Sequence, residues 1–173
     1  MDWTKAILET IDLRSFSNVW YWIGVIVLWS SLSHWIIGVP YDMIARAKRR
    51  GGDAEKDLID LARVNVNRVI DLSDSFGPWI IGFNFFLASS MGLLGFFYGF
   101  ELAQAMFLML VPVIIVGVLT VRAAKKIERE AQDVEMLCKI LNTHRVYIQA
   151  IGTLSIFVTS MYGMYDNLLV PAF

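Results

Sequence analysis

Long apolar runs without a charged residue alternate with polar segments along the whole chain. Four such runs cover residues 18–39, 76–100, 102–121 and 146–165. A helix rises about 1.5 Å per residue, so about 20 apolar residues cross a hydrocarbon core of about 30 Å. Each run reaches that length. The pattern therefore predicts an all-α membrane protein, a single domain over residues 1–173 with four transmembrane helices.

The segments between the runs are amphipathic. Residues 1–17 carry an apolar face typical of a short helix lying in the outer membrane interface. Residues 40–75 and 122–145 predict two cytoplasmic amphipathic helical segments. Both carry a mostly apolar seam with 4-3-4-3 spacing, which favours packing of one segment against the other. The seams are Leu58, Ala62, Asn65, Val69 and Leu72, and Ile127, Ala131, Val134, Cys138 and Leu141.

Glycine and proline indicate where the first polar segment changes direction. We expect the first transmembrane helix to continue to about Arg50, where Gly51-Gly52 breaks it. Asp53 then begins a helix that runs to about Ser73, and Gly77-Pro78 restarts the chain as the second span.

The second polar segment contains no glycine or proline between residues 119 and 150. A continuous helix would carry the chain too far from the membrane to return for the last span. Two alternatives follow: the helix bends along the membrane surface, or it forms a hairpin near Gln132-Asp133. Asn142-Thr143 is typical of an N-cap for the last span, which favours the surface bend.

Lysine and arginine predict the orientation. Seven of the 15 lie within residues 40–75 and six within residues 122–145, and the others are Lys5 and Arg14. The side of the membrane that carries most Lys and Arg is cytoplasmic. Four crossings then place both termini on the opposite side, the periplasm if the membrane is a bacterial inner membrane. A juxtamembrane cluster also predicts contact with anionic lipid headgroups. Its members are Arg46, Lys48, Arg49 and Arg50.

Composition agrees with a membrane protein. Hydrophobic residues make up 57% of the chain and charged residues 18%, whereas soluble domains average about 45–50% and about 25%. The net charge of -1 does not suggest nucleic acid as a partner. Cys138 is the one cysteine, which excludes an intramolecular disulfide and a cysteine-based zinc site. We expect Cys138 to be a small buried residue.

Small residues on the second and fourth spans predict close helix packing, because helices in lipid associate where their backbones can approach. They are Ala88, Gly92, Gly95, Gly99, Gly152 and Gly163. Packing within the four-helix bundle is the first interpretation, with Gly95 and Gly99 as a small-xxx-small pair. Contact with a second copy or with another membrane-protein subunit is the alternative.

Few polar residues in and beside the spans are candidates for binding a cofactor or for catalysis. His34 and His144, at similar predicted depth, could ligate a haem, but we expect separate hydrogen-bonding side chains and no cofactor. Glu101 suits the N-terminus of a helix, and for Asn84 we also expect a structural role. The chain contains no P-loop, GxSxG, HExxH or CxxC motif, so we assign no catalytic or metal-binding residue.

Three stretches of the chain resemble a family of small proteobacterial membrane proteins, some members of which are labelled as a component of the SufBCD iron–sulfur assembly complex. They are Asp12 to Asn18, Ser33-His34-Trp35 with Gly38-Val39-Pro40-Tyr41-Asp42, and Val64-Asn65-Val66-Asn67-Arg68. The resemblance implies an accessory role at the membrane and no catalytic residue. One cysteine is too few to hold an iron–sulfur cluster.

We therefore expect a non-catalytic accessory or scaffold subunit that oligomerises or docks onto a larger membrane complex. The lipid bilayer surrounds its transmembrane helices. A small membrane enzyme is an alternative, because the topology is similar to that of glutathione-linked membrane transferases. Their Arg-x-x-x-Asn-x-x-Glu pattern is matched by Arg63 and Asn67, but Ile70 replaces the glutamate. An oligomeric channel or transporter is a third possibility, although the spans offer few polar residues to line a pore.

Overall fold

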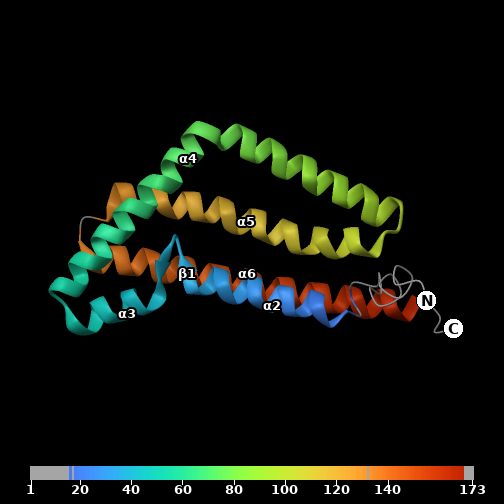
Figure 1. Cartoon of the computed structure of the whole chain (residues 1–173), viewed down its shortest axis with the longest axis horizontal. Coiled ribbons are helices and arrows are strands. Elements are labelled where there is room, and N and C mark those ends of the chain that lie inside the picture. Colours follow the sequence, from blue (N-terminus) through green and yellow to red (C-terminus); the bar gives the residue numbers. More distant parts are fainter. Residues whose placement is uncertain (1–15, 17, 132, 170–173) are drawn as a thin grey trace, which may run out of the picture.

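A computed structural model describes residue 16, residues 18–131 and residues 133–169, and nearly all of them are helical (Figure 1). Helix α2 (Val19–His34) leads into a two-stranded hairpin, β1 (Trp35–Ile36) and β2 (Val39–Pro40). Helices α3 (Tyr41–Arg50) and α4 (Asp53–Gly92) follow, and α4 passes into a short π-helix, η2 (Leu93–Phe97). The last two helices are α5 (Glu101–Glu130) and α6 (Val134–Leu169). The predicted interfacial helix of residues 1–17 falls, except for Phe16, outside the described residues.

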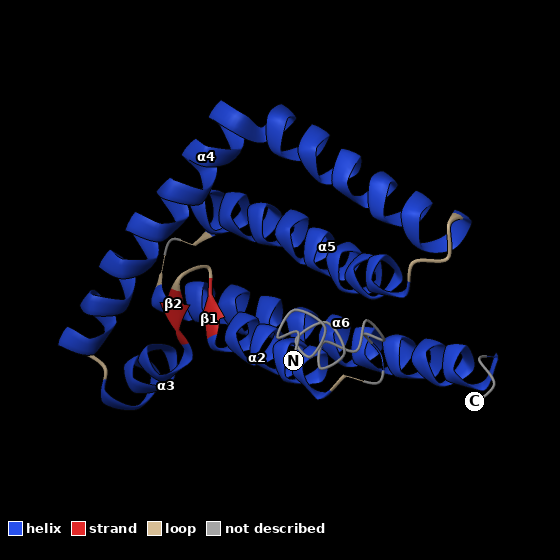
Figure 2. Ribbon diagram, turned by 45° about the vertical axis from the view of Figure 1, so that its right-hand side comes forward, coloured by secondary structure: helices blue, strands red, loops and turns tan. Residues whose placement is uncertain are grey.

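The elements divide the molecule into two ends (Figure 1). One end, which we call the head, contains the hairpin, α3, residues 53–75 of α4 and the connection between α5 and α6. The opposite end contains the start of α2, the turn between η2 and α5, and the last turns of α6. Between the two ends, α2 lies beside α6, and α5 lies between this pair and α4 (Figures 1 and 2).

The best-buried core lies in the head. Leu58 and Leu141 are fully buried there, and the head cluster draws on the hairpin and all four helices that reach it. The apolar layer beyond the head holds a smaller cluster centred on four buried residues. These are Val25, Trp29, Val116 and Ile148. Water drives apolar side chains together, whereas lipid does not, so a dense core in the head alone is the arrangement expected of a partly membrane-embedded chain.

Three helical stretches in the described chain are long and apolar enough to cross a membrane, namely Asp53–Phe97, Glu101–Glu130 and Val134–Asp166. Helix α2 is apolar but shorter, with 16 residues. The prediction of a helical protein is thereby confirmed, and three of its helices are long and apolar enough to cross a membrane.

The first predicted helix is wrong in its extent. It ends at His34, not near Arg50, because the hairpin interrupts it (Figure 2). Ile37 and Gly38 both have positive φ, at 54° and 72°, which is the backbone of a tight hairpin turn. Pro40 then starts α3, with the extended backbone of an N-cap residue.

The predicted break between residues 73 and 78 is also wrong. Helix α4 runs through this segment without interruption and bends instead (Figure 1). The ring of Pro78 clashes with the carbonyl of Asp74, four residues earlier, and a proline inside a helix typically produces such a bend. Lys125 of α5 holds the Asp74 carboxylate at 2.8 Å.

The second polar segment forms the helical hairpin, and the surface bend favoured by Asn142-Thr143 is wrong. Helix α5 ends at Glu130 and α6 begins at Val134. Asp133 caps the new helix by accepting a hydrogen bond from the backbone N–H of Met136 at 2.7 Å. Asn142 and Thr143 lie inside α6.

The two predicted seams do meet, in a shifted register. On α4 every fourth residue is buried, at Leu58, Ala62, Val66 and Ile70, and these pack in one cluster with Ile127, Leu137, Cys138 and Leu141. Leu72, which the spacing placed in the seam, is 51% exposed. Helix α4 is straight here, so it packs against its neighbours through a ridge of residues spaced four apart. The predicted 4-3-4-3 spacing would instead require a supercoiled helix.

Candidate functional site

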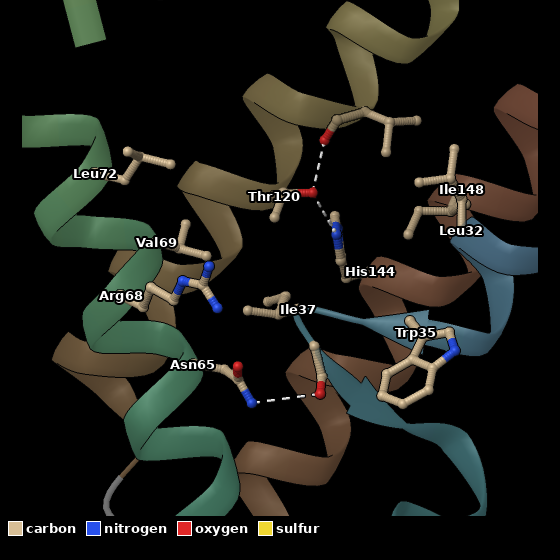
Figure 3. A pocket seen from close by; sticks show the side chains of 12 residues that line it. Leu32, Trp35, Ile37, Asn65, Arg68, Val69, Leu72, Thr120, His144 and Ile148 are labelled. Atoms are coloured by element: carbon tan, nitrogen blue, oxygen red, sulfur yellow. Dashed lines mark hydrogen bonds between the residues drawn. The ribbon is translucent and has the colours of Figure 1, made fainter. Parts of the chain in front are cut away.

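A cavity of about 300 Å³ lies beneath the hairpin, where α2, α4, α5 and α6 come together (Figure 3). Its walls are mostly apolar, and four polar side chains face it. These are Asn65 and Arg68 of α4, Thr120 of α5 and His144 of α6. The polar residues of the cavity are therefore as much as 79 positions apart in the sequence, from Asn65 to His144.

The hairpin forms the floor of this cavity. A β-branched residue rarely adopts positive φ, yet Ile37 does so and is buried. Such strain costs on the order of 1–3 kcal/mol and is found where the surrounding structure holds it. The amide of Asn65 supplies part of that hold, because it donates to the carbonyl of Gly38 at 3.3 Å and to Leu61 at 3.0 Å. A Cβ on Gly38 would lie 2.7 Å from Asn65 Oδ1, and the φ of 72° favours glycine at this turn.

His144 and Thr120 form a hydrogen-bonded pair in the upper wall (Figure 3). The Thr120 hydroxyl donates to the carbonyl of Val116 at 2.8 Å. Its single proton is thereby used, so the oxygen accepts from Nε2–H of His144 at 3.2 Å. His144 is 3% exposed, and this pairing keeps a buried polar ring partly satisfied.

Arg68 is the one cationic side chain among the described residues that line the cavity. Figure 3 shows its guanidinium pointing from α4 into the space beside Ile37 and Thr120. In the described part of the chain it takes part in no ion pair. The sequence offered no direct signal for this arrangement. Val39-Pro40 gave a weak signal for the hairpin that forms the floor of the cavity, because a residue before proline is biased away from helix.

The predicted packing glycines make close contacts inside the chain. A Cβ on Gly95 would lie 2.8 Å from the backbone nitrogen of Gln104, and one on Gly92 would lie 3.3 Å from the Phe107 ring. Gln104 also donates its amide to the Gly95 carbonyl at 2.8 Å, where the π-helix disturbs the regular ladder of bonds.

The glycines of α6 contact residues on the other side of the bundle. A Cβ on Gly152 would lie 2.8 Å from the Trp29 ring of α2, and one on Gly163 would lie 2.9 Å from Phe16. Ala88 is half-buried. Gly99 is not part of the helix that carries the other packing residues of the second span. It has a φ of 74° and lies in the turn after η2, so its predicted pairing with Gly95 as small-xxx-small is wrong.

The remaining polar residues have mainly structural contacts. Glu101 begins α5, and its carboxylate accepts the backbone N–H of Phe16 at 2.7 Å. Asn84 donates to the Ile80 carbonyl of its own helix at 2.8 Å. His34 is exposed at the end of α2, with its ring against Trp35, and does not line the cavity that His144 faces.

The basic cluster occupies α3. Arg46, Lys48, Arg49 and Arg50 are all exposed there, and the last three suit the C-terminal turn, where the helix dipole favours cations. Helix α3 leads away from the hairpin (Figure 1), so Arg50 lies at its distant end. Contact of this cluster with anionic lipid stays a prediction.

Arg63 and Asn67, the two matches to the transferase pattern, line a second cavity between α4 and the α5–α6 connection. Ile70, in place of the glutamate, is buried in the head core. The arrangement thus lacks the carboxylate that the pattern supplies at this position.

Cys138 is buried, as predicted, and burial raises the pKa of its thiol. A buried thiol with a raised pKa is a poor nucleophile. No cluster of three metal-ligating side chains occurs within the described residues. Comparison with protein-family models, with curated proteins and with solved structures gives no match.

Proposed function

We propose that the protein is a non-catalytic membrane subunit that associates, through the apolar half of α4 (residues 76–92), with an uncharged transmembrane helix of another subunit. The observation that carries this proposal is exposure. In the most apolar stretch of α4 and η2, 6% of the residues are buried within the described chain, against 22% in that of α5 and 28% in that of α6. The apolar half of α4 is thus almost uncovered by the other described helices.

The chemistry of this helix half defines the partner. Residues 76–92 contain no charged side chain, and large rings such as Trp79, Phe83 and Phe86 are at least 64% exposed. Between them, a Cβ on Gly82 would meet nothing within 4 Å. Helices in lipid associate by steric fit and close backbone approach. An apolar helix is the partner that can lie against the backbone of Gly82 without placing a charge in lipid.

We also propose four crossings of a bacterial inner membrane, with the head in the cytoplasm and both termini in the periplasm. The basic residues of α3 and of the first half of α4 support this orientation. Helix α2 supports the fourth crossing, because it is uncharged and packs against α6, with Trp29 over Gly152. An accessory role of this kind is also what the resemblance to the SufBCD-associated family implies.

Gly82→Leu tests the docking proposal. Since a Cβ on Gly82 would meet no described residue within 4 Å, the variant should keep its thermal stability but lose the larger assembly when its mass is measured in nanodiscs. The control is Gly24→Leu on α2, another open position, which should keep both. A homo-oligomer would identify the partner as a second copy, and a hetero-complex as a different subunit. An assembly that survives Gly82→Leu unchanged, or a wild-type protein that is a lone monomer after mild extraction, contradicts the proposal.

A further inference from the structure

Among the described residues, the cavity beneath the hairpin has a single cationic side chain, Arg68, and mostly apolar walls. We propose that it binds an anionic amphiphile, a molecule with one carboxylate or phosphate headgroup and a hydrocarbon tail. The proposal rests on Arg68, on the saturated hydrogen bonds of its polar neighbours and on the position of the cavity along the helices.

Arg68 selects an anion. Its planar guanidinium offers several N–H donors in a geometry that fits carboxylate and phosphate oxygens. Within the described chain no carboxylate forms an ion pair with it, and no Asp or Glu is among the described residues that line the cavity. Arg68 is exposed at the mouth of the cavity, so its guanidinium is open to an anion that arrives from outside the chain.

The neighbouring polar groups limit the headgroup to one anionic centre. The Asn65 amide already donates to Gly38 and Leu61, and the Thr120 hydroxyl donates to Val116. The Nε2–H of His144 is taken by Thr120. Among the described residues that line the cavity, Arg68 is thus the one cationic donor, which suits a monovalent headgroup and not a polyphosphate.

The walls supply the site for a tail. Several aliphatic side chains line the cavity, and the Trp35 ring lies at its edge (Figure 3). The aliphatic residues include Leu32, Val69, Leu72, Val116 and Ile148. A volume of about 300 Å³ is at the small end of ligand cavities. It can take the headgroup and the first methylenes, while the rest of a long chain stays in the bilayer.

The position of the cavity matches headgroup depth. Leu32 is in the last turn of α2, Thr120 closes the apolar run that ends at residue 121, and His144 comes just before the run that begins at residue 146. Three apolar runs therefore end beside the same cavity. Lipid headgroups and their first carbons lie at this boundary, so the site can fill directly from the membrane.

Quenching of Trp35 fluorescence measures occupation of the site. The purified full chain in detergent is titrated with a dibrominated fatty acid, and separately with phosphatidylglycerol carrying dibrominated chains, because bromine quenches indole at contact. The part of the quenching that is lost in Trp35→Phe reports this cavity. Phosphatidylcholine with the same chains is the zwitterionic control, and inorganic phosphate is the competitor without a tail.

Arg68→Gln should raise the half-saturating concentration of the anionic probes by about tenfold or more, the loss expected for a charged hydrogen bond. Arg63→Gln, the same change on the same helix but facing another cavity, should leave it unchanged, and both variants should keep the thermal stability of the wild type. The anionic probe that saturates at the lower concentration identifies the source as free acid or phospholipid. Equal weakening by both variants, equal quenching by the zwitterionic lipid, or displacement by phosphate alone would overturn the proposal.

Discussion

Gly95→Leu is expected to destabilise the bundle at the end opposite the head. The new side chain would start 2.8 Å from the backbone nitrogen of Gln104, and backbone cannot rotate aside as a flexible side chain can. Overpacking a buried site typically costs about 1–3 kcal/mol. The shift would also break the bond from the Gln104 amide to the Gly95 carbonyl, a further loss of about 1 kcal/mol.

Thermal unfolding in detergent, followed by circular dichroism, checks this expectation. The control is Gly24→Leu, the same replacement in α2, where a Cβ meets nothing within 4 Å. We expect a clearly lowered melting temperature for Gly95→Leu and a nearly unchanged one for Gly24→Leu. Equal melting temperatures for the two variants would mean that η2 does not pack against α5 as described.

Leu58→Ala should have the second large effect, because it empties the centre of the head. Leu58 is 0% exposed and packs in the cluster formed with α3, α5 and α6. Removing a buried leucine side chain costs about 2–5 kcal/mol, from lost burial and from the cavity left behind. Leu72→Ala on the same helix should cost little, since Leu72 is 51% exposed and surface changes are usually within about 0.5 kcal/mol.

Proteolysis of the head distinguishes these two variants without unfolding the membrane helices. The connection near Ala131 and the Gly51-Gly52 turn should become sensitive to protease in Leu58→Ala and stay protected in Leu72→Ala. Sensitivity in Leu72→Ala alone would instead support the supercoil register that the 4-3-4-3 spacing predicts.

The apolar runs predicted three helices that are long and apolar enough to cross a membrane, whereas the run at residues 18–39 contains the shorter helix α2. They did not predict where a helix ends within or beside a run. The hairpin at Trp35–Pro40 lies at the end of an uncharged stretch, so hydrophobicity alone favours more helix there. Local backbone preferences decide instead: Gly38 accepts positive φ and Pro40 restricts the residue before it.

Pro78 shows the opposite failure. Gly77-Pro78 is a strong signal for a break in a soluble helix, and the prediction followed it. In α4 the chain bends and continues, because a proline can kink a helix without ending it. The sequence alone does not distinguish a bend from a break.

The cavity beneath the hairpin could not be predicted from spacing. Arg68 and Asn65 lie three residues apart on one helix, but Thr120 and His144 reach the cavity only because α6 runs back beside α5 after the chain turns between Glu130 and Val134. The surface bend favoured by Asn142-Thr143 would have separated His144 from Thr120. The wrong prediction for the segment between α5 and α6 was therefore enough to prevent prediction of the cavity.

Labelling of single cysteines tests the proposed topology of four crossings most directly. In a Cys138→Ala background, Thr4→Cys, Lys56→Cys and Ala172→Cys are each exposed to a membrane-impermeant maleimide in cells with a permeabilised outer membrane. Lys56 is a suitable head position because its side chain is 76% exposed. The account predicts that Thr4→Cys and Ala172→Cys react in intact cells, and that Lys56→Cys reacts only after lysis. Reaction of Lys56→Cys in intact cells, or opposite results for Thr4→Cys and Ala172→Cys, would contradict it.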